Sequence, residues 1–122
     1  MKSYSYKTLY MLFVLLFTSL KAQGNPQYNF VINKAENLIL DNKYNEALEN
    51  YSKLKSGFTY IYAKDIYNAM ICSNRQKNWE QTFVWAKLFL SKTSVKEFFN
   101  QKKFKEFRKT KYWKKILKLD IT

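Results

Sequence analysis

The strongest constraint on the fold is an internal repeat with a spacing of 35 residues. Five positions recur at that spacing: the first set is Ala35, Leu38, Tyr44, Ala47 and Tyr51, and the second is Met70, Ser73, Trp79, Thr82 and Ala86. Repeats of this length are typical of paired helices that cannot bury their apolar faces alone and must stack on one another. The repeat therefore predicts an all-α protein built from stacked helix pairs.

The rarity of turn-forming residues also favours an all-α fold. The chain has one proline, Pro26, and two glycines, Gly24 and Gly57. Strands depend on such residues in the turns that connect them. With so few of them, the chain is expected to form helices joined by short polar breaks.

Apolar residues at helical spacing predict four main helices, over about 27–40, 44–55, 59–75 and 78–90. Gly57 is expected to end the second helix in the left-handed conformation that glycine adopts readily. Ser94 is followed three residues later by Glu97, a capping-box pattern that predicts a fifth helix. A short last helix is expected over 111–119.

Residues 1–22 have the composition of a secretory signal peptide. Basic residues precede an almost wholly apolar run, 8–20, and the small residues Ala22 and Gly24 follow it. This order matches the charged, apolar and cleavage regions of such peptides, so cleavage is expected near 22–24. The apolar run is shorter than the roughly 20 residues of a spanning helix. An exported protein, periplasmic or extracellular, is therefore favoured over one anchored through uncleaved residues 8–20.

Positive charge is concentrated in the last quarter of the chain. The whole chain has a net charge of +13, and residues 92–118 contain eleven basic and two acidic residues. Such a surplus attracts anionic membranes or acidic polymers, with Lys114, Lys115 and Lys118 as candidate contact residues. The alternative is a solvated face that caps the helix stack. Nucleic acid is not expected, because phosphate sites favour arginine and the chain has 20 lysines against 2 arginines.

Residues suited to catalysis or metal binding are scarce. The chain has no histidine and a single cysteine, Cys72, which excludes His-based nucleophile pairs, a zinc site and an intrachain disulfide. Cys72 lies in an apolar run and is expected to be buried. Glu46 and Glu49 are the best acidic pair, and residues of that kind are usually solvated. The sequence therefore predicts a non-enzymatic protein with no cofactor and no metal.

Three aromatic residues are candidates for binding a partner. Tyr60 and Tyr62 are placed at the start of the third helix, near where stacked helix pairs expose a concave face. Trp85 lies off the apolar stripe of the fourth helix. Tyrosine and tryptophan are enriched at interface hot spots. The alternative for each of the three is packing within the core.

The repeat resembles the tetratricopeptide repeat family. Ala35 and Ala47 resemble the small residues at that family's helix contacts, and Tyr44 and Tyr51 its aromatic residues. The second repeat departs from the pattern, since Met70 and Thr82 stand where small residues are usual. The segment that follows the two repeats is similar to the ending of secreted tetratricopeptide-like proteins of Bacteroidetes-type bacteria.

The resemblance implies two stacked antiparallel helix hairpins, about 28–57 and 60–91, closed by capping helices in the basic segment 94–119. The whole domain would span 27–119 and act as an exported protein–protein interaction module whose partner is another protein or peptide. Binding of an anionic membrane or acidic polymer through the Lys-rich segment remains the alternative function. Peripheral membrane contact and homo-oligomer formation also stay open, because two hairpins are fewer than the roughly three that stable stacks need.

Overall fold

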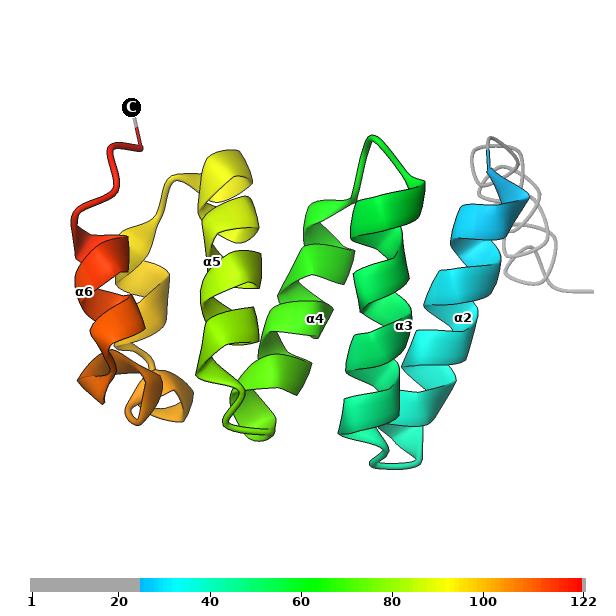
Figure 1. Ribbon diagram of the computed structural model, residues 1–122, viewed down its shortest axis with the longest axis horizontal. Coiled ribbons are helices and arrows are strands. Elements are labelled where there is room, and N and C mark those ends of the chain that lie inside the picture. Colours follow the sequence, from blue (N-terminus) through cyan, green and yellow to red (C-terminus); the bar gives the residue numbers. More distant parts are fainter. Residues whose placement is uncertain (1–24, 122) are drawn as a thin grey trace, which may run out of the picture. The chain divides into compact units, whose positions relative to one another are not determined.

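The computed structural model describes residues 25–121, and all regular elements within them are helical. They are α2 (Pro26–Leu40), α3 (Tyr44–Gly57), α4 (Ala63–Arg75), α5 (Trp79–Thr93), the 3₁₀ turns η1 (Lys96–Asn100), η2 (Lys102–Phe104) and η3 (Phe107–Lys109), and α6 (Lys111–Leu117) (Figure 1). The predicted all-α class is thereby confirmed. The predicted export segment, residues 1–22, lies outside the described residues.

The chain divides into two units, Met1–Phe30 and Val31–Thr122. In the described part of the first unit, α2 begins at Pro26, whose missing N–H is not needed at the first helical position. The side-chain oxygen of Asn25 accepts a hydrogen bond from the backbone N–H of Tyr28 at 3.2 Å. This bond caps the helix, because the first N–H groups of a helix have no intrahelical acceptor.

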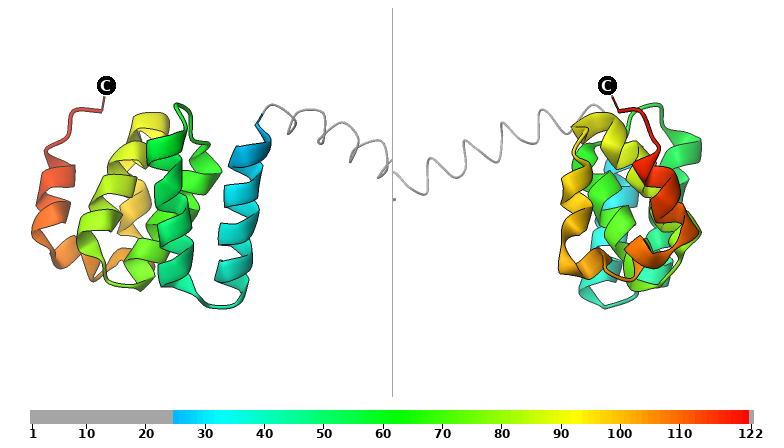
Figure 2. Two further views of the ribbon diagram at one scale, coloured as in Figure 1. Left: turned by 45° about the vertical axis from the view of Figure 1, so that its right-hand side comes forward. Right: turned by 90° about the vertical axis from the view of Figure 1, so that its left-hand side faces the viewer.

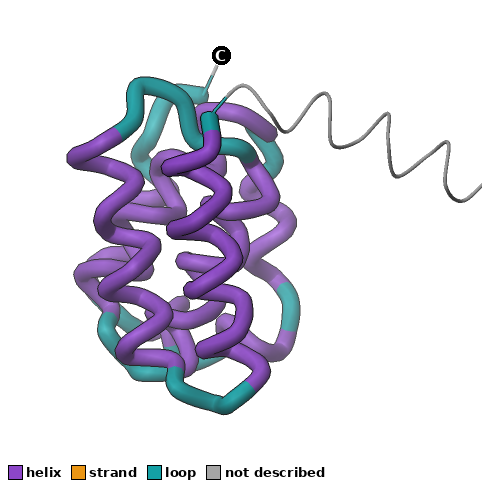
Figure 3. Tube along the Cα trace, turned by 90° about the vertical axis from the view of Figure 1, so that its right-hand side faces the viewer, coloured by secondary structure: helices purple, strands orange, loops and turns teal. Residues whose placement is uncertain are grey.

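Within the second unit, α3 packs on α4, α4 on α5, and α5 on α6 (Figures 1 and 2). The helices α3, α4 and α5 alternate in direction, and no strand occurs between residues 25 and 121 (Figure 3). Ala47 of α3, Ala69 of α4 and Ala86 of α5 are fully buried. Such small side chains let neighbouring helix axes approach to about 8–10 Å.

The two breaks of the repeat, after α2 and after α4, share the same backbone hydrogen bonds. The equivalent bonds are Lys43 N–H to Leu38 O at 2.8 Å and Asn78 N–H to Ser73 O at 2.9 Å. Asn42 and Lys77 adopt the left-handed conformation, with φ of 59° and 54°. This combination is a Schellman-type helix end, here formed without glycine. The 35-residue repeat of the sequence is therefore also a repeat of backbone structure.

The break between α3 and α4 contradicts two predictions. Gly57 is the last helical residue of α3 and has no positive φ, so it does not adopt the predicted left-handed conformation. The chain leaves the helix at Phe58, which is extended with φ −139° and ψ 141°. Helix α4 begins at Ala63 instead of Thr59. The intervening run is rich in β-branched and aromatic residues, which favour extended backbone over helix.

The buried face of α5 also differs from the predicted stripe. Helical spacing predicts a stripe of Trp79, Phe83, Ala86 and Leu90. Ala86 and Leu90 are buried, but Trp79 and Phe83 are only partly so, whereas Trp85, off the stripe, is fully buried. Helix α5 packs against α4 and against the C-terminal segment, as the 4.8 Å between the rings of Phe89 and Phe98 shows. Contacts on two sides make its buried surface wider than a single stripe.

The predicted fifth α-helix is replaced by three short 3₁₀ turns. Ser94, the expected N-cap, is left-handed with φ 57° and ends α5, and no side chain caps η1. Each turn contributes one fully buried phenylalanine, namely Phe99, Phe104 and Phe107. The ring of Phe99 lies 5.0 Å and 6.3 Å from the other two. Packing of these rings, and not a regular helix, sets the path of the chain.

Two basic side chains hold these turns by binding backbone carbonyls. The Arg108 guanidinium donates hydrogen bonds to the carbonyls of Phe99 and Gln101. The Lys96 ammonium donates to the carbonyl of Leu117, the last residue of α6, at 3.0 Å and to that of Leu119, just beyond the helix, at 2.7 Å. Carbonyls at a helix end lack intrahelical partners, and cations are favourable there. Part of the positive charge of the C-terminal segment is therefore structural.

Candidate functional site

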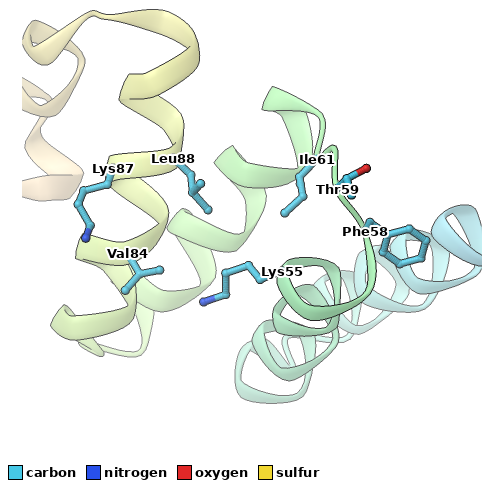
Figure 4. A pocket seen from close by; sticks show the side chains of 7 residues that line it. All are labelled: Lys55, Phe58, Thr59, Ile61, Val84, Lys87 and Leu88. Carbon is cyan, nitrogen blue, oxygen red and sulfur yellow. The ribbon is translucent and has the colours of Figure 1, made fainter.

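An open, mostly apolar groove lies between α3 and α5, beside the loop that joins α3 to α4 (Figure 4). Its volume is about 540 Å³, within the range of about 300–1,000 Å³ that is common for ligand sites. The residues that line it are Lys55, Phe58, Thr59, Ile61, Val84, Lys87 and Leu88. The lining thus includes two lysines and no acidic residue.

The α3–α4 loop carries Tyr60 and Tyr62, two of the predicted binding residues. Ile61 lines the groove, whereas the tyrosines on either side of it are 58% and 56% exposed. The two tyrosine rings meet edge to face at 5.1 Å, and the Lys92 ammonium lies 3.9 Å from the centre of the Tyr60 ring. The two tyrosines therefore flank the groove without lining it; Tyr60 lies on the loop, and Tyr62 is the N-cap residue at the start of α4.

Lys55 extends from the last turn of α3 across the groove toward α5 (Figure 4). Its Nζ donates a hydrogen bond to Oε1 of Gln81 at 3.3 Å and lies 4.8 Å from the centre of the Trp85 ring. Burial lowers the pKa of the Lys55 ammonium. Among the ion pairs of residues 25–121, none involves Lys55.

Trp85, the third predicted binding residue, is not accessible to a partner. Its side chain is fully buried beneath Lys55. Its indole N–H has no hydrogen-bond acceptor among the described residues. The prediction of a binding role is wrong because the tryptophan faces the inside of the helix stack. The alternative interpretation, core packing, is confirmed.

The basic residues Lys114 and Lys115 of α6 and Lys118, its C-cap, are exposed, whereas Ile116 is buried. The Lys115 ammonium lies 5.6 Å from the centre of the Tyr112 ring. Exposure of this kind fits both interpretations of the segment, a solvated cap and an anion-binding face. Whether these lysines bind an anionic surface stays a prediction.

The titratable groups considered for chemistry lie apart from the groove. Glu46 and Glu49 are both exposed on α3. Cys72 is buried as expected, and burial raises the pKa of its thiol to about 11, so it is protonated at neutral pH. Between residues 25 and 121, no group of three or more metal-ligating side chains lies together.

Sequence reasoning missed the groove. One wall comes from Phe58, Thr59 and Ile61, and the helix that the sequence predicts over about 59–75 includes the last two. The usable signal was the β-branched and aromatic run directly after Gly57, a composition poorly suited to a helix start. A longer loop at this point separates α3 from the N-terminal end of α4 and leaves room beside α5.

No helix within residues 25–121 is both long and apolar enough to cross a membrane. No protein-family model, curated protein or solved structure matches the chain. The resemblance to tetratricopeptide proteins therefore depends on this chain's own residues alone.

Proposed function

We propose that the protein is an exported, non-enzymatic helical-repeat module that binds a segment of another protein in the groove between α3 and α5. The observation that carries the proposal is the groove itself, an open and mostly apolar hollow of about 540 Å³. Apolar grooves between helices are a recurrent way of binding short protein segments.

The tetratricopeptide-like part of the proposal is supported by the repeated backbone. Two hairpins, α2–α3 and α4–α5, would stack in register, with the C-terminal segment as the closing layer. The identical bonds at the two breaks and the buried alanines Ala47, Ala69 and Ala86 support this arrangement. The ring cluster around Phe99 would supply the layer that a third hairpin provides in longer stacks.

The occupant we propose is a segment with apolar side chains and at least one acidic residue. Phe58, Ile61 and Leu88 offer apolar surface to it. The only charged residues in the lining are Lys55 and Lys87, so the groove is complementary to negative charge. Without residues 1–22, which contain three lysines and no acidic residue, the net charge falls from +13 to +10. This charge adds a long-range attraction for acidic partners and repels basic ones.

The binding proposal is tested by selecting displayed random peptides on the full chain. Selected peptides are expected to lose about tenfold or more in affinity for Leu88→Asp, because a carboxylate in the groove would be desolvated by the apolar ligand. The matched control is Leu117→Asp, the same substitution at an exposed position of α6, which should leave affinity unchanged. Circular dichroism establishes that both variants are folded.

A Lys114→Glu, Lys115→Glu, Lys118→Glu triple variant tests the alternative function, binding through the basic segment. Under the groove proposal this variant should bind the selected peptides as the parent does. If the triple variant loses binding and Leu88→Asp does not, the basic segment is the binding surface. In that case affinity would also fall steeply with added salt, because exposed charges are screened.

The export part of the proposal rests on the sequence of residues 1–22. Mass spectrometry of the protein recovered from its own cells tests it. A mature N-terminus near residues 22–24 is expected. An intact Met1 would contradict cleavage.

A further inference from the structure

Lys55 is a half-buried cation that forms no ion pair with the other described residues. Two other cations of the described residues have stronger partners: Lys64 pairs with the Glu36 carboxylate at 3.0 Å, and Arg108 binds two carbonyls. Lys55 has one neutral amide oxygen, that of Gln81, at 3.3 Å. A partly desolvated ammonium is costly unless an opposite charge compensates it.

The direction of the side chain places this cation inside the groove. In Figure 4, Lys55 points from α3 across the groove toward Val84, whereas Lys87 lies at the left edge of the lining residues, across α5 from Lys55. Lys87 is also exposed, and its Nζ lies 4.6 Å from the centre of the Phe83 ring. A segment that fills the groove would therefore desolvate Lys55 further and leave Lys87 in contact with water.

The Lys55 ammonium also lies over the ring of Trp85, 4.8 Å from its centre. This cation–π contact is favourable, but it supplies no compensating negative charge. An ammonium can only donate hydrogen bonds, and the acceptor that Lys55 has among the described residues, Oε1 of Gln81, is neutral. Lys55 would therefore favour a ligand group that accepts hydrogen bonds and carries negative charge.

We infer that the docked segment carries an Asp or Glu whose carboxylate binds the Lys55 ammonium, and that Lys55 is the specificity-determining residue of the groove. This inference rests on the proposed function. A carboxylate accepts hydrogen bonds with both oxygens, and its charge-assisted bond to an ammonium is roughly twice as strong as a neutral one. Apolar side chains next to that acid would contact Phe58, Ile61 and Leu88. The recognised motif is thus an acid adjoining apolar residues.

The test repeats the random-peptide selection on three versions of the full chain: the parent, Lys55→Met and Lys87→Met. The two variants change net charge equally and keep an unbranched apolar stem, so they differ only in position. Peptides selected by the parent and by Lys87→Met should share an acid at a fixed place beside apolar residues. Peptides selected by Lys55→Met should keep the apolar residues and lose the acid.

Affinity measurements then isolate the contact. For the parent, replacing Glu by Gln in a selected peptide should weaken binding about tenfold or more, since bonds to charged groups are worth more than neutral ones. For Lys55→Met the same replacement should change affinity little. This double-mutant cycle reports the Lys55–carboxylate pair itself. If Lys55→Met does not fold, the Glu-to-Gln replacement is compared on the parent and on Lys87→Met. Equal losses of about tenfold would support the role of Lys55, and a loss that disappears in Lys87→Met would assign the contact to Lys87.

The outcomes distinguish a failure of the inference about Lys55 from a failure of the proposed function. Selected peptides that are apolar without a fixed acid, or equal losses in Lys55→Met and Lys87→Met, would overturn the role of Lys55 and leave groove binding intact. Failure to select any peptide, or peptides that bind Leu88→Asp normally, would overturn the proposed function and this inference with it.

Discussion

The repeat region, α3 to α5, and the C-terminal segment 94–119 bury their residues in different ways. In the repeat region, long helices meet at small side chains such as Ala47, Ala69 and Ala86. In the C-terminal segment, one seven-residue helix and three 3₁₀ turns surround large rings centred on Phe99. The first region is regular and closely packed along its helices, whereas the second depends on a few large residues.

The difference predicts how each region responds to substitution. Where helices meet at alanine, there is no room for a larger side chain, so overpacking should be the main risk. Where a few rings fill the interior, loss of one ring leaves a cavity that short turns cannot close. Removal of a ring should therefore be the most damaging change within the C-terminal segment, and enlargement of a buried alanine should be damaging where the repeat helices meet.

The largest effect is expected for Phe99→Ala. The Phe99 ring is fully buried and lies within 6.3 Å of five other rings, those of Phe89, Phe98, Phe104, Phe107 and Trp113. Its removal should lower the free energy of unfolding by about 3–5 kcal/mol. Urea denaturation followed by circular dichroism measures the loss. Hydrogen exchange should show that amides of 94–119 lose protection before those of α4.

The matched control is Phe83→Ala, which removes the same ring from a partly exposed position on α5. Phe83→Ala should lower the free energy of unfolding by clearly less than Phe99→Ala does. Equal costs for Phe83 and Phe99 would mean that the ring cluster is not the core of the C-terminal segment.

Arg108→Met should cost less, about 1.5–3 kcal/mol, the usual range for hydrogen bonds to a charged group. Methionine keeps the apolar stem and removes the guanidinium that binds the carbonyls of Phe99 and Gln101. Thermal denaturation compares it with Lys109→Met, which removes an exposed charge paired only with exposed Glu106. Lys109→Met should change stability by less than about 0.5 kcal/mol. Indistinguishable melting of the two variants would show that the turns hold without Arg108.

Ala69→Leu should destabilise the repeat region by about 1–3 kcal/mol, because Ala69 is fully buried in the helix that contacts both α3 and α5. The same enlargement at exposed Asn45 of α3 is the control and should be nearly neutral. Chemical denaturation measures both. A neutral Ala69→Leu would show that α4 does not pack as closely as a repeat requires.

The same contrast explains which parts of the fold could be predicted from the sequence. The two breaks at 41–43 and 76–78 recur as polar triplets, and their local backbone bonds do not depend on distant contacts. The path of residues 94–110 depends on packing among the rings of Phe99, Phe104 and Phe107. A local sequence pattern does not specify such packing. Ser94 followed by Glu97 therefore predicted a helix that does not form.

The candidate site was less predictable than the helices. Exposure of Tyr60 and Tyr62 agrees with their selection from the sequence, but the groove beside them depends on a loop that was placed in a helix. Trp85 was misplaced because periodicity assigns one buried face to a helix, and α5 is covered on two sides. Periodicity alone cannot reveal a second neighbour.

The smallest effect is expected for Gly57→Ala. The sequence-based expectation and the structure predict opposite signs for the change in its free energy of unfolding. The structure places Gly57 inside α3 with no positive φ, and an added Cβ would meet nothing within 4 Å. Gly57→Ala should therefore raise the free energy of unfolding by about 0.4–1 kcal/mol, chiefly by restricting the unfolded chain. A left-handed Gly57 would instead make alanine destabilising, because a Cβ is unfavourable there. The sign is measured by comparing the urea midpoints of Gly57→Ala and the parent, provided that the dependence of the unfolding free energy on urea is unchanged. A lower midpoint for Gly57→Ala would indicate that α3 ends before Gly57, and that the loop forming one wall of the groove starts earlier than described.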